Sequence, residues 1–315
     1  MDWIGSVRRV VSWASGKYNK LFRPAEWNIG IVHAPIHAFL ELGFEPEIHW
    51  LPAPTSGKFV ADPFGLQVDG RLYLLYEEFD FETNRGSIAS IMLENDRFVS
   101  KPEVVLNPSF HVSYPYLVHH EGSLYFIPEA AAIREVAIYK ADNETGRWSK
   151  FKTLLSDIAA VDTTIFQHND RWWMMFTDKD LGSNRALCIY HAPGLFGPWT
   201  AHTRNPVKDD NTSSRPAGKP FVHDGTLYRP AQDCSRTYGG AVVINRLDRL
   251  TPDEFRETTV ASVQPDRSGP YPDGIHTLSA AGDITILDGK RHVFIKKALT
   301  SALAEKVKFV FSHKR

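Results

Sequence analysis

The sequence predicts an all-β fold, a five-bladed β-propeller preceded by a short N-terminal helix. Three observations support this prediction. Five segments repeat one pattern of a short apolar strand, a tight turn and a second strand. The turns recur at a nearly regular spacing along the chain. In addition, 12% of the 315 residues are aromatic and the chain contains 21 Gly and 20 Pro, a composition that favours strands and turns over a helical bundle.

Each repeated segment is typical of a β-hairpin, because Asp-Gly or a related pair separates two runs of alternating apolar residues. The segments are FVADPFGLQVDGRLYLLYEE (59–78), VSYPYLVHHEGSLYFIPEA (112–130), VDTTIFQHNDRWWMMFTD (161–178), RPAGKPFVHDGTLYRPAQD (215–233) and HTLSAAGDITILDGKRHVFI (276–295). Their first turn residues are Asp69, Glu121, Asn169, Asp224 and Asp288, which lie 52, 48, 55 and 64 residues apart. This spacing is near the period of propeller blades, whereas the period-two alternation argues against a helical solenoid.

The two ends of the chain are expected to differ in structure. Residues 1–25 predict an amphipathic helix, and residues 26–315 a single propeller domain. Ile4, Val7, Val11, Tyr18 and Leu21 share one helical stripe, whereas Arg8, Arg9, Lys17 and Lys20 lie outside it. Such a helix either lies on a membrane or partner surface or packs against the propeller, and we favour packing. Segments 27–33 and 306–312 look like terminal strands that close the ring, and segment 180–211 holds outer strands of the third blade.

Charge and cysteine content exclude several classes of protein. With 36 Lys+Arg against 37 Asp+Glu the net charge is −1, so no nucleic-acid partner is expected. Cys188 and Cys234 form neither a disulfide framework nor a zinc motif, and we expect no metal or other cofactor. No apolar run approaches the roughly 18 residues that span a bilayer. Since Arg8 and Arg9 interrupt any secretory signal, we expect a cytoplasmic protein, with peripheral membrane contact through residues 1–25 as the alternative.

The hairpins are predicted to gather acidic residues at one mouth of the propeller channel. Counting from the turns pairs position 62 with 77, 114 with 129, 162 with 177 and 217 with 232, all at open hairpin ends. A β-bulge would favour Glu78 or Asp233 instead. The acids expected near the mouth are Asp62, Glu77, Glu78, Glu129, Asp162, Asp178 and Asp233. The acids in the turns are expected to face solvent at the opposite end. Because clustered carboxylates repel one another, the mouth is a candidate functional site.

A channel mouth lined with acids and aromatic rings suits a sugar ligand. Cleaving or forming a glycosidic bond needs one carboxylic acid and one carboxylate on opposite sides of the anomeric carbon. The catalytic candidates are Asp62, Glu129 and Asp162, and the substrate-binding candidates are Glu77, Glu78, Tyr114, Arg215, Gln232, Asp233 and His276. Arg215 suits a clamp on a carboxylate or phosphate of the ligand and equally a structural ion pair with Asp233 or another mouth acid.

Several motifs carry a family resemblance. VADPFG, HVSYPYLV, YFIPEA, SRPAGKPF, YRPAQDCSRTYGG and GIHTL, taken in order over about 27–295, resemble the N-terminal domain of plant glucosamine inositolphosphorylceramide transferases and its bacterial relatives. That domain is similar, more remotely, to the five-bladed furanosidase-type glycoside hydrolases, including family 43. In the plant enzymes the recognised glycosyltransferase module lies beyond this domain, so the resemblance does not by itself imply that activity.

The hydrolase resemblance assigns roles to three positions. It implies that Asp62 is the general base and that Asp162 stands at the position of the general acid. Tyr114 falls where the hydrolases carry the aspartate that tunes the proton donor, and Glu129, across the same hairpin, is the other donor candidate. Two hypotheses follow: an enzyme that hydrolyses or transfers a glycosyl unit, which we favour, and a noncatalytic glycan-binding propeller. Both predict a carbohydrate or glycolipid partner.

Overall fold

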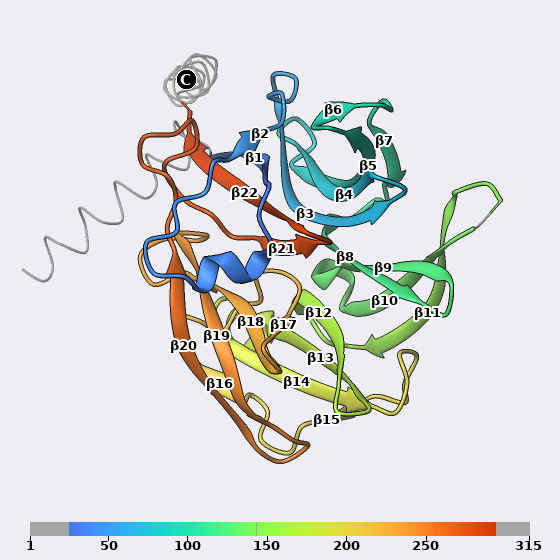
Figure 1. The fold of residues 1–315 in the computed structure, drawn as a ribbon. Helices are drawn as coiled ribbons and strands as arrows, with labels where there is room; N and C mark the ends of the chain where they lie inside the picture. Colours follow the sequence, from blue (N-terminus) through green and yellow to red (C-terminus); the bar gives the residue numbers. More distant parts are fainter. Residues whose placement is uncertain (1–24, 143, 294–315) are drawn as a thin grey trace, which may run out of the picture. The chain divides into compact units, whose positions relative to one another are not determined.

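The computed structural model describes residues 25–142 and 144–293 (Figure 1). Apart from Ala25, the predicted helix over residues 1–25 lies outside the described residues, and so does the predicted strand at 306–312. Among the described residues no helix is long and apolar enough to cross a membrane.

The chain divides into two units. One is Trp27–Lys290, and the other combines Met1–Glu26 with Arg291–Arg315. In the described part of the second unit, Arg291 Nη2 and Glu26 Oε2 form an ion pair of 3.0 Å. All strand residues of the blades except Ala25, Glu26, Arg291 and His292 belong to the unit Trp27–Lys290, which is the subject of the remaining description.

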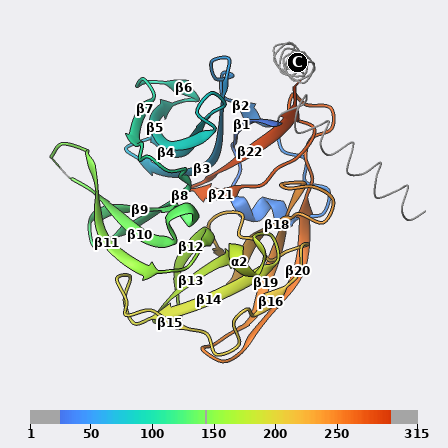
Figure 2. The ribbon, with the colours of Figure 1, turned by 180° about the vertical axis from the view of Figure 1, so that it is seen from behind.

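Five antiparallel sheets form the blades of a ring, which confirms the predicted five-bladed β-propeller (Figure 1). The innermost strands of the five blades are β3 (Lys58–Val68), β8 (Ser113–His120), β12 (Ala160–His168), β17 (Phe221–His223) and β21 (Leu278–Ala281). Each of these is the first strand of a predicted hairpin. The apolar residues of each strand pack its two faces against the two neighbouring blades. Described residues outside the strands include three short helical turns: η1 (Ile36–Leu40), η2 (Ala131–Ile133) and α2 (Lys179–Gly182), which Figure 2 shows from behind.

The remaining strands extend each sheet outward from its innermost strand. Blade 1 adds β4 (Arg71–Asp80), β5 (Arg85–Glu94), β6 (Arg97–Phe98) and β7 (Glu103–Leu106), and blade 2 adds β9 (Ser123–Glu129), β10 (Glu135–Ala141) and β11 (Trp148–Ser156). Blade 3 adds β13 (Arg171–Asp178), β14 (Ala186–Ala192), β15 (Thr200–Ala201) and β16 (Lys208–Asp209), and blade 4 adds β18 (Thr226–Asp233), β19 (Ala241–Leu250) and β20 (Phe255–Val263). Blade 5 adds β22 (Ile284–His292), β1 (Ala25–Val32) and β2 (His49–Trp50). The strands expected at 27–33 and within 180–211 are therefore present.

Four of the five predicted turns are confirmed, and the fifth is wrong. In the first hairpin Asp69 and Gly70 both have positive φ, 50° and 74°, as a two-residue hairpin turn of this type requires. In the fifth blade the turn falls at Gly282 and Asp283, not at Asp288. Asp288 instead lies inside β22 with a fully buried side chain, because ITIL and the residues after it continue as one buried strand.

A β-bulge interrupts the same place in three innermost strands. The pairing shifts between Ala61 and Phe64 in β3, and at the corresponding places in β8 and β12. Asp62, Tyr114 and Asp162 occupy these bulges, with φ of 52°, 45° and 55°. Left-handed backbone is uncommon outside glycine, and strained bulges gather next to functional sites. The repeat therefore presents three equivalent, strained positions toward the channel.

Because of the bulges, the observed strand pairing differs by one residue from the predicted pairing. Ala61 pairs with Glu77, Ser113 with Glu129, and Val161 with Thr177. The extra residue lies in the innermost strand, so Glu77 and Glu129 keep their places near the mouth, and the expectation that a bulge would favour Glu78 is wrong.

Candidate functional site

Five carboxyl groups gather at the open ends of the hairpins. They belong to Asp62 in the β3 bulge, Glu77 in β4, Glu129 at the end of β9, Asp162 in the β12 bulge and Asp288 in β22. All but Glu129 are buried, and the Glu129 side chain keeps 14% of its exposure. The cluster therefore joins four blades, with Glu129 as its most accessible carboxyl group.

The Asp62 carboxylate is fixed by three neighbouring groups. Its Oδ2 accepts a hydrogen bond of 3.2 Å from the Tyr114 backbone N–H, and its Oδ1 accepts one of 3.0 Å from Thr277 Oγ1. His276 Nε2 lies 3.6 Å from Oδ1. These contacts come from blades 2 and 5, so the Asp62 side chain links its own blade to both neighbours.

His276 and Asp288 form a buried ion pair beside Asp62. His276 Nδ1 lies 2.6 Å from Asp288 Oδ2, and Asp288 Oδ1 accepts backbone N–H groups of His276 and Thr277 at 3.0 Å. Trp27 stacks on the imidazole with ring centroids 3.8 Å apart. Burial disfavours the charged imidazole, but the Asp288 and Asp62 carboxylates outweigh it and raise the pKa of His276. Asp62, His276 and Asp288 are close enough to share a cation, but all four carboxylate oxygens of Asp62 and Asp288 already accept hydrogen bonds.

Arg215 holds the Asp162 carboxylate from the side of blade 4. Arg215 Nε and Nη2 donate to Asp162 at 2.6 and 3.2 Å, and Gln232 Nε2 donates to the same carboxylate at 2.8 Å. Arg215 Nη2 also lies 4.0 Å from Glu129 Oε2, and its guanidinium carbon lies 4.8 Å from the centre of the Tyr238 ring. Of the two predicted roles for Arg215, the structure therefore contains the ion pair with a mouth acid, although the partner is Asp162.

Burial raises the pKa values of Asp62 and Glu129 to different degrees. It raises the pKa of Glu129 to about 8; Asp162 adds to the rise and Arg215 opposes it. Burial also raises the pKa of Asp62 to about 6, against the opposing effect of His276. Since one pKa lies below neutrality and the other above it, Asp62 is mostly ionised and Glu129 mostly protonated near pH 7. Environments that separate the pKa values of two carboxyl groups in this way typically assign a base and an acid.

Glu77 presents a free oxygen inside the cluster. Burial, followed by the Asp62 and Glu129 carboxyls, raises the pKa of Glu77 well above its ordinary range. Among the described residues no group donates a hydrogen bond to Glu77 Oε1, and His111 Nε2 lies 3.8 Å from it. An unsatisfied buried polar atom is costly, so a ligand hydroxyl would be a suitable partner for this oxygen.

Gly86 makes room for Glu77, which gives a testable prediction. A Cβ atom at Gly86 would collide with Glu77 Oε1 and lie 2.5 Å from the Val112 carbonyl oxygen. Gly86→Ala is therefore expected to lower the free energy of unfolding by about 1–3 kcal/mol, as overpacking does elsewhere. Gly194→Ala is the matched control, since no atom lies within 4 Å of its added Cβ. Denaturant unfolding of both variants measures the difference, and equal stabilities would contradict the crowding at Gly86.

The predicted site residues separate into two groups. The structure brings together Asp62, Glu77, Glu129, Asp162, Arg215, Gln232 and His276. It places the side chains of Glu78, Asp233 and Tyr114 outside this group, although the Tyr114 backbone N–H donates to Asp62. The Lys58 ammonium pairs with Glu78 at 2.6 Å, and Asp233 Oδ1 caps its own loop by accepting the Ser235 N–H at 2.9 Å. The Tyr114 side chain is fully buried and its hydroxyl accepts the Gly218 N–H at 2.8 Å.

Other members of the site were not predicted. The sequence predicts that Asp288 lies in a turn and Trp27 in a closing strand, and it indicates no role for Thr277 or Tyr238. Tyr238 stands in the motif YRPAQDCSRTYGG, but nothing in its spacing indicates that it meets Arg215. A signal for Asp288 does exist, since Gly282-Asp283 is also a turn pair and its choice would have placed Asp288 within a strand.

The five-bladed propeller fold is shared with solved glycoside hydrolases. The structure is similar to the catalytic domain of a GH62 α-L-arabinofuranosidase from Coprinopsis cinerea, with a TM-score of 0.54 at 13% identity, covering 74% of this chain and 82% of that one. At this identity the similarity establishes the fold alone.

The chain belongs to the family described as glucosamine inositolphosphorylceramide transferase 1, N-terminal, whose model matches residues 51–269. It is 33% identical over 218 residues to glucosamine inositolphosphorylceramide transferase 1 of Oryza sativa subsp. japonica, covering 66% of this chain and 29% of the relative. It is 30% identical over 249 residues to the Arabidopsis thaliana protein of the same name, covering 74% and 32%. The chain thus spans less than a third of the length of these relatives, and the predicted family resemblance is confirmed.

Proposed function

We propose that the mouth binds a carbohydrate and that Asp62 and Glu129 hydrolyse or transfer a glycosyl unit by acid/base chemistry. The observation that carries this proposal is the separation of the pKa values of these two carboxyl groups of the cluster, about 6 for Asp62 and about 8 for Glu129. Glycosidic bond chemistry requires one carboxylate and one carboxylic acid, and this pair supplies both near pH 7. The names of the plant relatives add a sugar–lipid headgroup as the first substrate class to test.

The roles follow from the contacts. Glu129, the more exposed carboxyl, donates a proton to the leaving oxygen, and Asp62 acts as base toward water or an acceptor hydroxyl. Asp162 accepts hydrogen bonds from Arg215 and Gln232, and its charge repels an ionised Glu129 and so favours the protonated form of Glu129. Asp162 is therefore a positioning residue that keeps the proton on Glu129, a task that the hydrolase resemblance would give to the position of Tyr114.

The proposed roles predict a bell-shaped pH dependence of turnover. Asp62 must lose its proton to act as base, so activity rises as the pH passes its pKa of about 6. Glu129 must keep its proton to act as acid, so activity falls as the pH passes its pKa of about 8. The profile of kcat/KM against pH measures both limbs, and a profile that is flat from pH 5 to 9 would contradict the assignment of these two groups.

A glycan-binding function without catalysis is the second candidate. Tyr114 replaces an acid at one of the three bulges, and the Arg215 guanidinium engages the acid at another. Both features suit a site that holds hydroxyl groups rather than one that cleaves a bond. Under either function we propose that, if the ligand is a glycolipid, residues 1–25 contact the membrane.

A mass-spectrometric turnover screen distinguishes the two functions. The panel contains furanosides, pyranosides and glycolipid headgroups, with and without activated sugar donors. Wild type, Asp62→Asn and Glu78→Gln are compared, because Glu78 lies next to Glu77 but pairs with Lys58 outside the cluster. The proposal expects product from wild type and Glu78→Gln and none from Asp62→Asn. Glycan binding without product from any protein would overturn catalysis and support the second candidate.

A further inference from the structure

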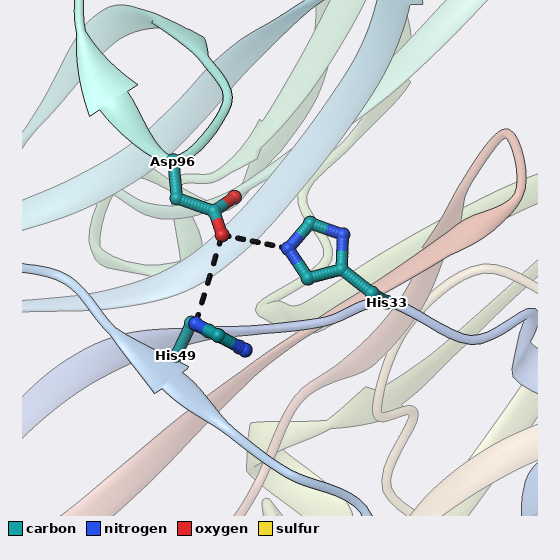
Figure 3. A group of neighbouring side chains, drawn as sticks. All are labelled: His33, His49 and Asp96. Carbon is teal, nitrogen blue, oxygen red and sulfur yellow. Dashed lines mark hydrogen bonds and ion pairs between the residues drawn. The ribbon is translucent and has the colours of Figure 1, made fainter.

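Three side chains from two blades meet at a second place in the propeller. His33 follows β1, His49 begins β2, and Asp96 lies in the turn between β5 and β6. Figure 3 shows both imidazole rings directed at the Asp96 carboxylate. Leu93, three residues before Asp96, pairs with Leu72 at the end of the β4–β5 pair that is distant from Glu77. The cluster therefore lies at the blade end opposite the acidic mouth.

One carboxylate oxygen faces two imidazole nitrogens. Asp96 Oδ2 lies 2.6 Å from His33 Nε2 and 3.7 Å from His49 Nδ1. The three atoms all lie within 4.8 Å of one another, and the rings meet edge to face with centroids 5.1 Å apart. At 3.7 Å, His49 Nδ1 is too far from Asp96 Oδ2 for a hydrogen bond. Hydrogen bonding therefore explains the position of the His33 ring but not that of the His49 ring.

These distances approach those around a tetrahedral metal ion. Zinc binds imidazole nitrogen and carboxylate oxygen at about 2.0–2.2 Å, which places neighbouring ligand atoms roughly 3.4 Å apart. The His49–Asp96 distance already fits, and the His33–Asp96 distance needs to open by less than about 1 Å, within the reach of side-chain rotation. The His33 and His49 side chains are 51% and 43% exposed, so the ion has an entry path and water can complete its coordination.

A second carboxylate lies beside the other ring nitrogen of His49. While Nδ1 faces Asp96, the opposite ring nitrogen, Nε2, lies 3.8 Å from Glu47 Oε1. Metal-binding histidines commonly direct their second nitrogen at a carboxylate, which fixes the ring and strengthens the ligand.

We propose that His33, His49 and Asp96 bind one zinc ion, or a similar divalent transition metal, that cross-links blade 5 to blade 1. Two imidazoles and one carboxylate suit zinc, whereas magnesium and calcium prefer oxygen ligands alone. The ion would join the loop after β1 to the β5–β6 turn and stabilise the folded state by binding it selectively. The site is independent of the proposed function at the mouth.

Zinc titration of the untagged full chain against a chromogenic chelator tests the site, with His33→Ala, His49→Ala and Asp96→Asn as variants. His119→Ala is the control, since His119 is an exposed histidine of β8 away from the cluster. We expect wild type and His119→Ala to bind one zinc ion more than each cluster variant, or to bind it at least about tenfold more tightly. Zinc should also raise the thermal midpoint of wild type and His119→Ala, but not that of the three variants, and magnesium should raise none.

A second measurement separates this site from the buried group of Asp62, His276 and Asp288, which also has metal-like spacing. An anomalous difference map of zinc-soaked crystals should contain a peak bonded to His33, His49 and Asp96. Equal zinc stoichiometry, affinity and thermal response in wild type and all three variants would overturn the proposal, and so would a wild type that binds no zinc.

Discussion

Glu129→Gln is expected to lower turnover about 10²–10⁴-fold on substrates with a poor leaving group, the range typical for removal of a general acid. Glutamine keeps the size and polarity of the side chain but has no acidic proton to transfer. Binding should change much less, because the amide can still hydrogen-bond a sugar hydroxyl. Steady-state kinetics with an alkyl glycoside and with a nitrophenyl glycoside of the same sugar measure the effect.

The comparison of leaving groups identifies the role. Nitrophenolate departs without protonation, so its glycoside should lose far less activity in Glu129→Gln than the alkyl glycoside. Glu78→Gln controls for the removal of an acid on a neighbouring hairpin, since Glu78 pairs with Lys58. Equal losses on both glycosides would show that Glu129 is not the proton donor.

Arg229→Met is expected to lower the free energy of unfolding by about 3 kcal/mol, because it leaves a buried carboxylate with fewer partners. Arg229 is fully buried in blade 4 and donates to both oxygens of Glu257, at 2.9 and 2.7 Å. It also donates to the Ser213 carbonyl at 2.6 Å. Lys208 Nζ lies 2.8 Å from Glu257 and still balances part of its negative charge in the variant. We therefore expect a loss at the lower end of the range that is usual for a broken buried ion pair.

Two further variants test this explanation. Arg246→Met removes an exposed arginine on β19 that pairs with Asp248 at 2.7 Å, and we expect little change in stability. The double variant Arg229→Met with Glu257→Met should recover most of the loss, since it removes both buried charges. Denaturant unfolding measures all three. A double variant as unstable as Arg229→Met alone would contradict the explanation.

Much of the fold could be predicted because its information is local. Asp-Gly and Asn-Asp turns between alternating apolar runs specify hairpins, and their spacing specifies blades. The fifth hairpin was misplaced because its segment contains two turn pairs, Gly282-Asp283 and Asp288-Gly289, and local rules do not choose between them. The choice depends on tertiary packing: a Cβ at Gly289 would collide with Trp50 and Tyr271, so this glycine serves a close approach rather than a turn.

The site was predictable to the extent that it follows the repeat. Asp62, Glu129 and Asp162 were found by counting from turns, because equivalent positions of blades converge on one axis. The sequence does not predict which strand of a hairpin carries the extra residue of a bulge. Because that residue lies in β3 and not in β4, Glu77 rather than Glu78 joins the cluster. The sequence predicts an ion pair of Arg215 with a mouth acid but not that Asp162 is the partner, because the two residues lie 53 positions apart and their contact depends on how blades 3 and 4 pack.

The proposed acid/base chemistry depends on the opposite protonation states of Asp62 and Glu129 near pH 7, and carboxyl ¹³C NMR measures these states without any substrate. Wild type labelled at the Asp and Glu side-chain carboxyls is titrated, and Asp62→Asn and Glu129→Gln assign the two signals. The proposed acid/base pair predicts a glutamate signal with a midpoint of about 8 that disappears in Glu129→Gln. It also predicts an aspartate signal with a midpoint of about 6 that disappears in Asp62→Asn. Titration of both groups at ordinary carboxyl pKa values of about 4 would contradict it.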